Sequence, residues 1–137
     1  MYDELSISFD NPATDALGYQ HVSGKLFCGR DQMELQFKER DRAFRKSETQ
    51  VISFDYGEIE RVRFISKWFR PKFLVLSTRS PEKIAAFPGT EVGLVELRVS
   101  RDSIKDAKRV KSLIEFRQSE AFVEESEDRI SRGRDSE

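Results

Sequence analysis

The chain has 137 residues, of which 37% are hydrophobic and 36% are charged, and its formal net charge is -1. This length favours one domain with a single core, and 11 phenylalanines supply large apolar side chains to fill it. The near-zero net charge argues against broad nucleic-acid binding, and a single cysteine excludes an internal disulfide.

No continuous apolar run approaches the roughly 20 residues that a membrane-spanning helix needs. The first ten residues, MYDELSISFD, are acidic and lack the basic start of a secretory signal. We therefore expect a cytoplasmic protein, with peripheral contact to a membrane left open.

Residues 1–17 are interpreted as a lead-in that lies on the domain surface or extends to a partner. Leu5, Ile7 and Phe9 alternate with polar residues, so the segment could form a short edge strand before Asn11 and Pro12 interrupt it.

Period-two alternation predicts antiparallel strands through most of residues 18–100. The expected strands are 18–27, 33–38, 49–53, 59–65, 73–78, 84–87 and 92–100. Turn residues separate several of them, at 28–31, 56–57 and 88–89, and the charged stretch 39–47 forms a longer connection.

From residue 102 the apolar period changes to that of an α-helix, expected over about 102–120. Residues 123–137, VEESEDRISRGRDSE, are almost wholly polar, and we expect a disordered charged tail there. The predicted core combines strand and helix positions: Leu26, Leu35, Phe37, Val62, Phe64, Leu97, Ala107, Val110 and Ile114.

Seven short antiparallel strands followed by one amphipathic helix is the order of the pleckstrin-homology (PH) superfold. The runs GKLF at 24–27, IERV at 59–62, WFR at 68–70 and FLVL at 73–76 resemble GRAM-like and bacterial PH-like domains, as does PG at 88–89 followed shortly by VGLVEL. The resemblance covers about residues 18–120. It implies a mainly-β, partly open seven-stranded barrel over 18–122, capped by the C-terminal helix. It implies no catalysis, and members of the group bind phosphoinositides or proteins.

A basic aromatic strip is the main candidate for an anion-binding or partner-binding surface. It comprises Arg61, Arg63, Lys67, Trp68, Phe69, Arg70 and Lys72, and only one acid, Glu60, lies within 59–80. In the alternative interpretation, Glu58, Glu60 and Glu96 neutralise these cations across strands and the aromatic side chains belong to the core. We expect Trp68 to be largely buried with the cations outside, which puts a protein contact ahead of a membrane contact.

Phe116 lies off the apolar stripe of the predicted helix and is a candidate partner contact. In the alternative interpretation, residues 1–17 cover the Phe116 side chain and it contacts no partner.

No catalytic, cofactor or metal constellation stands out. His21 is the only histidine, and no arrangement of histidine or asparagine accompanies Cys28, whose position beside Arg30 could otherwise activate a thiol. We therefore predict a non-enzymatic module that needs no cofactor or metal and that binds a protein partner or self-associates. One alternative is a peripheral module that reads anionic lipid headgroups through residues 61–72. Another is a barrel that holds a small apolar ligand.

Overall fold

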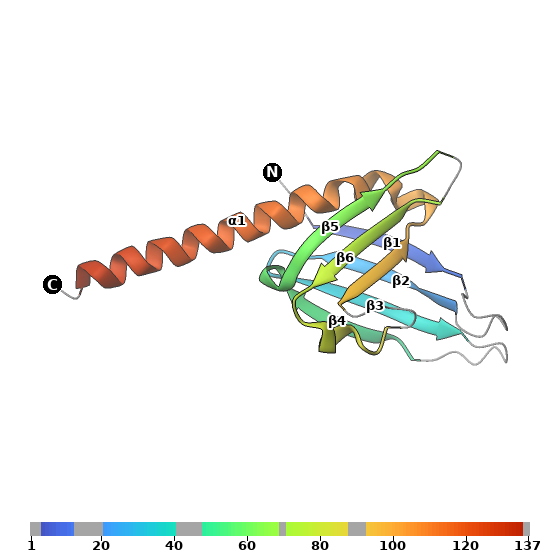
Figure 1. Ribbon diagram of the computed structural model, residues 1–137, viewed down its shortest axis with the longest axis horizontal. Helices are drawn as coiled ribbons and strands as arrows, with labels where there is room; N and C mark the ends of the chain where they lie inside the picture. Colours follow the sequence, from blue (N-terminus) through green and yellow to red (C-terminus); the bar gives the residue numbers. More distant parts are fainter. Residues whose placement is uncertain (1–3, 13–20, 41–47, 69–70, 88–92, 136–137) are drawn as a thin grey trace.

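The computed structural model describes residues 4–12, 21–40, 48–68, 71–87 and 93–135, with residues 40 and 124–135 described by their backbone alone. These residues form two antiparallel sheets and one long C-terminal helix (Figure 1). The mainly-β class is confirmed, but the described strands do not close into a barrel.

The first sheet has the order β1-β2-β3-β4 and the second the order β5-β6-β7, so each is a simple meander. The strands are β1 (Leu5–Asn11), β2 (His21–Cys28), β3 (Gln32–Arg40), β4 (Gln50–Asp55), β5 (Ile59–Ile65), β6 (Phe73–Thr78) and β7 (Leu94–Arg98). Three 3-10 turns, η1 (Tyr56–Glu58), η2 (Pro81–Ile84) and η3 (Arg101–Ser103), precede or connect the elements, and α1 spans Ile104–Asp135.

The β2–β3 hairpin follows the predicted alternation. Met33, Leu35 and Phe37 are fully buried, while the intervening side chains are partly exposed. A Cβ atom at Gly24 would lie 1.9 Å from the Gln36 carbonyl oxygen, so only glycine permits this close backbone approach. All nine predicted core residues pack in the core, with Phe64 only partly buried.

The edge strand predicted within residues 1–17 is present, but the interpretation of this segment as a surface lead-in is wrong for residues 5–11. They form β1, which pairs with β2 along its whole length, and Ile7 and Phe9 are buried. β1 also joins the two sheets, because Phe9 forms a bridge with Val99 and the Ser100 N–H donates to the Ser8 carbonyl at 2.9 Å. The segment is therefore part of the core.

The strand predicted at 84–87 is also wrong. Pro81 opens the 3-10 turn η2 instead, and Ile84 and Phe87 enter the core from this turn and the residues after it. The Phe87 ring lies 5.0 Å from the Phe37 ring and 6.0 Å from the Phe9 ring, measured between centroids. Two isolated apolar residues can thus be buried without any strand pairing.

The first part of α1 packs against the sheets and contacts both β1 and β5, where Ala107, Val110, Leu113 and Ile114 are buried. The predicted disordered tail is wrong for residues 123–135, because α1 continues to Asp135 and projects away from the sheets (Figure 1). Glutamate and arginine are good helix formers, residues 101–137 contain no proline, and acids precede arginines by four residues at 125/129 and 128/132.

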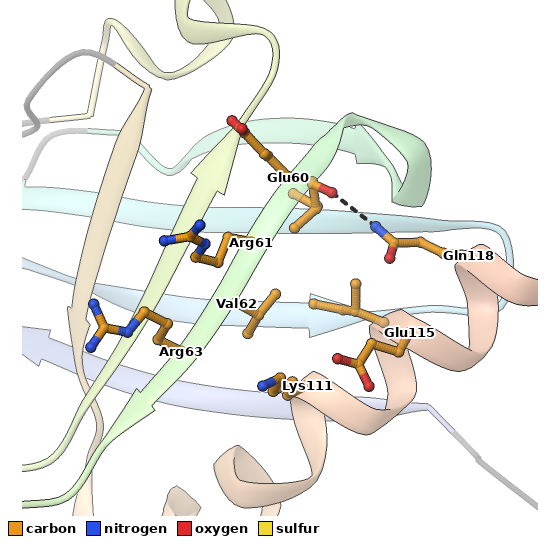
Figure 2. Close-up of a pocket in the computed structure, with 9 residues that line it drawn as sticks. Glu60, Arg61, Val62, Arg63, Lys111, Glu115 and Gln118 are labelled. Carbon is orange, nitrogen blue, oxygen red and sulfur yellow. Dashed lines mark hydrogen bonds between the residues drawn. The ribbon is translucent and has the colours of Figure 1, made fainter.

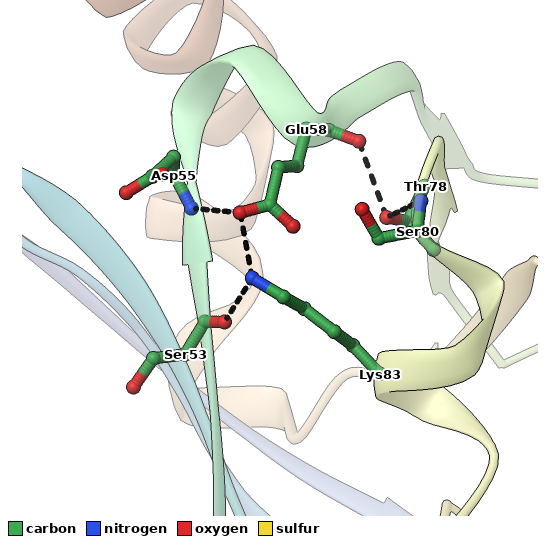
Figure 3. A network of polar contacts seen from close by, with 6 residues as sticks. All are labelled: Ser53, Asp55, Glu58, Thr78, Ser80 and Lys83. Atoms are coloured by element: carbon green, nitrogen blue, oxygen red, sulfur yellow. Dashed lines mark hydrogen bonds and ion pairs between the residues drawn. The ribbon is translucent and has the colours of Figure 1, made fainter.

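A polar network fixes the corner where the chain passes from one sheet to the other (Figure 3). The Glu58 carboxylate accepts hydrogen bonds from Lys83 Nζ at 2.7 Å and from the Asp55 N–H at 3.3 Å. The Glu58 carbonyl accepts from the Arg79 N–H at 2.7 Å and from the Thr78 hydroxyl at 3.2 Å. Glu58 therefore ties η1 to both ends of the β6–η2 connection.

Replacing Ile114 with Ala should lower the free energy of unfolding by about 2–5 kcal/mol, because this side chain is 1% exposed and its loss leaves a cavity. Urea denaturation would measure the change. The matched change Lys108→Ala, on the exposed side of the same helix, should stay within about 0.5 kcal/mol. A cost below about 1 kcal/mol at Ile114 would contradict tight packing of α1.

Stability should depend on pH through Glu58. The hydrogen bond from Lys83, the main cause, holds the pKa of this carboxyl below its ordinary value of 4.5. Because the pKa is lower in the folded state, the ionised group stabilises the fold above about pH 4.5, and this contribution is lost as the pH falls through the folded-state pKa. Glu58→Gln should therefore destabilise most above pH 4.5, and its difference from the unmodified protein should shrink in acid. Thermal unfolding across this pH range would measure the effect, with Glu82→Gln as the control. If Glu58 had no such role, the difference in stability between Glu58→Gln and the unmodified protein would stay constant with pH.

Candidate binding surface

The exposed face of the second sheet carries two cations on its edge strand. Arg61 and Arg63 are both exposed, and Val62 between them turns into the core. The strand register places Arg63 beside Val75 and Val75 beside Glu96, so the nearest acid in that row lies two strands away. No salt bridge to either arginine is present in the described part of the chain. Both guanidinium groups are therefore open to an external anion.

The alternative interpretation, in which Glu58 is one of three acids that neutralise the strip, is wrong for Glu58. Its carboxylate accepts hydrogen bonds from Lys83 Nζ at 2.7 Å and from the Asp55 N–H at 3.3 Å, and is thus engaged within the sheet corner (Figure 3). Glu60 is exposed on the same strand as the arginines. The positive charge of this face is thus only partly balanced.

The tip of the β5–β6 hairpin exposes the single tryptophan. Trp68 is 88% exposed, so the expectation that it is buried is wrong. The last cross-strand pair of this hairpin is Ile65 with Phe73, and Trp68 lies beyond it in the chain. Lys67 beside it is exposed, and Lys72 Nζ donates to the Ser66 hydroxyl at 3.0 Å across the base of the tip. Phe69 and Arg70 fall outside the described residues.

A groove of about 370 Å³ runs between β5 and α1 (Figure 2). Its lining comprises Ile59, Glu60, Arg61, Val62, Arg63, Lys111, Ile114, Glu115 and Gln118. The Gln118 amide donates to the carbonyls of Tyr56 and Ile59, each at 2.8 Å, and so fixes the helix at one end of the groove. Three cations and two acids border an apolar floor.

The structure thus brings Arg61 and Arg63 together with a residue that the sequence did not indicate, Lys111. Lys111 precedes the buried Ile114 by three positions, so it lies beside the stripe that packs on β5. Helical spacing alone could have identified it, once the facing strand was known.

Phe116, the second candidate contact, is 39% exposed. Its ring lies 5.7 Å from the Arg117 guanidinium carbon. The described part of residues 1–17 is occupied in the first sheet as β1. Phe116 is therefore partly exposed on α1, with the Arg117 guanidinium against its ring.

Cys28 and His21, the two residues considered for chemical reactivity, both lie on β2 of the first sheet. Cys28 is fully buried, and burial raises the pKa of its thiol to about 12, so a thiolate is not accessible near neutral pH. The His21 ring contacts the Asp10 carboxylate at the pairing of β2 with β1. Among the described residues, no cluster of three or more histidine, cysteine or acidic side chains could hold a metal ion.

A scan against models of protein families matched none, and searches of the curated proteins and of the solved structures found no significant match. None of the described helices combines the length and the apolar composition required to cross a membrane.

Trp68 should report its own exposure, since it is the only tryptophan in the chain. We expect red-shifted fluorescence emission and strong quenching by iodide, both of which a buried indole would lack. Trp68→Ala should change the free energy of unfolding by no more than about 0.5 kcal/mol, as for other exposed sites. A loss of about 3–5 kcal/mol, the cost typical of a core aromatic, would contradict the exposed position.

Proposed function

We propose that this chain is a non-enzymatic PH-like module that docks on anionic membrane surfaces through the β5–β6 hairpin tip and the exposed face of β5. The observation that carries the proposal is the 88% exposure of Trp68 in a tip that also presents Lys67. An indole has an apolar body and a polar N–H, a combination suited to the boundary between headgroups and acyl chains.

The PH-like part of the proposal is supported by the order of elements. A four-stranded meander is followed by a three-stranded meander and then by a helix that packs against a strand of each sheet. Because a fold of this kind hosts unrelated functions, the binding surface and not the fold must carry the functional argument.

Electrostatics favour an anionic surface. Arg61, Arg63, Lys67 and Lys72 lie along one hairpin, and each cation near an anionic membrane contributes about 1 kcal/mol of attraction. The protein as a whole has a net charge of -1, so attraction is confined to this hairpin and would orient the molecule as it approaches.

A protein partner is the second candidate, and the groove between β5 and α1 favours it. β5 is an edge strand of its sheet, and an extended peptide with acidic side chains could pair with it beside Arg61, Arg63 and Lys111. The exposed tip lies outside this groove and would have no role in such binding. The alternative of an apolar ligand between the sheets has no support, because the rings of Phe9, Phe37 and Phe87 pack together there.

Co-sedimentation with vesicles would test the membrane proposal. The protein should bind vesicles that contain phosphatidylserine and should not bind neutral phosphatidylcholine vesicles. Raising the salt from about 0.1 M to about 1 M should release it, because the Debye length falls from about 10 Å to about 3 Å. Trp68→Ala should weaken binding with little change in this salt dependence, because the indole contribution is apolar.

A charge-reversal pair provides the matched control. Arg61→Glu with Arg63→Glu should abolish vesicle binding, whereas Lys25→Glu with Arg30→Glu, an equal change of charge at exposed positions of the first sheet and its turn, should preserve it. Equal losses in both variants would indicate an unspecific charge effect. Absence of binding by the unmodified protein would overturn the proposal and favour the groove and a protein partner.

A further inference from the structure

The projecting half of α1 is the largest feature that the proposed membrane surface does not use. Ile114 is the last buried residue of the helix in the described side chains, and Gln118 makes its hydrogen bonds to the corner at η1 and β5. Beyond that point the helix extends away from both sheets (Figure 1). A largely polar helix of this length is only marginally stable in water unless it packs on something.

Apolar and small residues recur along this half at intervals of seven. The larger side chains are Phe116, Val123 and Ile130, and the small ones, each three residues further on, are Ser119, Ser126 and Gly133. This is the spacing of the two contact positions of a paired helix, in which every seventh residue returns to the same side. Phe116 is 39% and Val123 52% exposed.

The members of this repeat whose side chains are described lie on the side of α1 that faces away from the body of the protein. Each helical residue advances by about 100°, so Val123 lies about half a turn from Ile114, nine positions earlier, whose side chain faces the sheets. A second helix could therefore lie along the repeat without meeting β1 or β5.

We propose that the projecting half of α1 pairs antiparallel with the same segment of a second copy of this chain. In an antiparallel pair each layer joins one position of the larger set to one of the smaller set, so Phe116 would meet Gly133, Val123 would meet Ser126 and Ile130 would meet Ser119. A parallel pair would instead stack large on large and small on small, which leaves gaps in alternate layers.

A hollow in the helix surface fits this arrangement. A shallow depression of about 360 Å³ lies at Ser119, between the side chains of Phe122 and Val123 and those of Glu115 and Gln118. The antiparallel register directs the partner's Ile130 to this position. The small residue and the hollow thus receive the larger side chain.

Charge order also favours the antiparallel pair. Residues 129–134 hold three arginines and no acid, whereas residues 115–120 hold Glu115, Glu120 and a single arginine, Arg117. In the register above, Arg134 lies level with Glu115 and Arg129 with Glu120, while Arg132 lies level with Arg117, which pairs with Glu120 of its own helix at 3.2 Å. A parallel pair would place the arginine block against its own copy.

Sedimentation velocity over a range of protein concentrations tests the association. The paired segment, from 116 to 133, is only about 27 Å long, so we expect a reversible dimer with a dissociation constant in the micromolar range. Val123→Asp should raise that constant at least about tenfold, because it places a charge in the contact. Val51→Asp is the matched control: Val51, on β4, is 54% exposed, nearly the same as Val123, and this variant should dimerise normally. Circular dichroism would establish that both variants are folded.

Cross-linking tests the direction of the pair. The native Cys28 is fully buried, so an introduced cysteine will be the reactive one. In the antiparallel register the two copies of residue 126 lie about 4–5 Å apart along the axis, and the two copies of residue 119 about 16 Å apart. A short bis-maleimide should therefore join Ser126→Cys subunits efficiently and Ser119→Cys subunits poorly.

Three results would overturn the proposal: a monomer at every concentration up to several hundred micromolar, a dimer that Val123→Asp leaves intact, or equal cross-linking at positions 119 and 126. None depends on the membrane proposal, because vesicle binding is measured through residues of β5 and the β5–β6 tip.

Discussion

The structure depends on β1, the strand that holds the two sheets together. Its Ile7 and Phe9 side chains fill the core, while its backbone pairs with β2 and reaches the end of β7. Asn11 adds a reciprocal link, because its amide donates to the Glu96 carbonyl at 2.8 Å and its oxygen accepts from the Arg98 N–H at 2.7 Å. The Ser8 N–H donates to the Ser103 hydroxyl at 2.9 Å, so the same strand also fixes the start of α1. The orientation of α1 beside β5, and with it the groove, follows from this strand.

Sequence periodicity predicted most of the individual elements but not which strands complete the fold. The alternation of Leu5, Ile7 and Phe9 predicted an edge strand, and β1 does lie at the edge of the first sheet. The alternation could not reveal the contacts of β1 with Val99 and Ser100, because these residues lie far along the chain. The count of seven strands was right, yet one predicted strand, at 84–87, is a 3-10 turn, and β1 takes its place in the count. Ile84 and Phe87 show why: both side chains are buried, but burial does not require a strand.

The sequence predicted which residues make up the candidate surface, but it did not predict which of their side chains are exposed. Two arginines separated by one residue on a strand must share a face, and the structure has both exposed. Trp68 has no such constraint, because a hairpin tip can fold back on the core or extend past it, and the alternation of the flanking strands is the same in both cases. The extent of α1 was missed for a related reason. Low apolar content excludes a buried segment, but it does not exclude a helix, whose backbone hydrogen bonds are internal.

The two proposed contacts lie at separate parts of the molecule and would reinforce each other. The tip of the β5–β6 hairpin and the projecting end of α1 extend from opposite ends of the structure (Figure 1), so pairing of the helices leaves the tip uncovered. A few cations and one indole give only weak attraction to a surface, because each cation contributes about 1 kcal/mol. Linking two such tips through paired helices makes the second contact intramolecular, and this raises overall affinity without any additional contact by either tip. A weak tip and a weak helix pair would together make membrane residence depend on protein concentration, which neither contact would achieve alone.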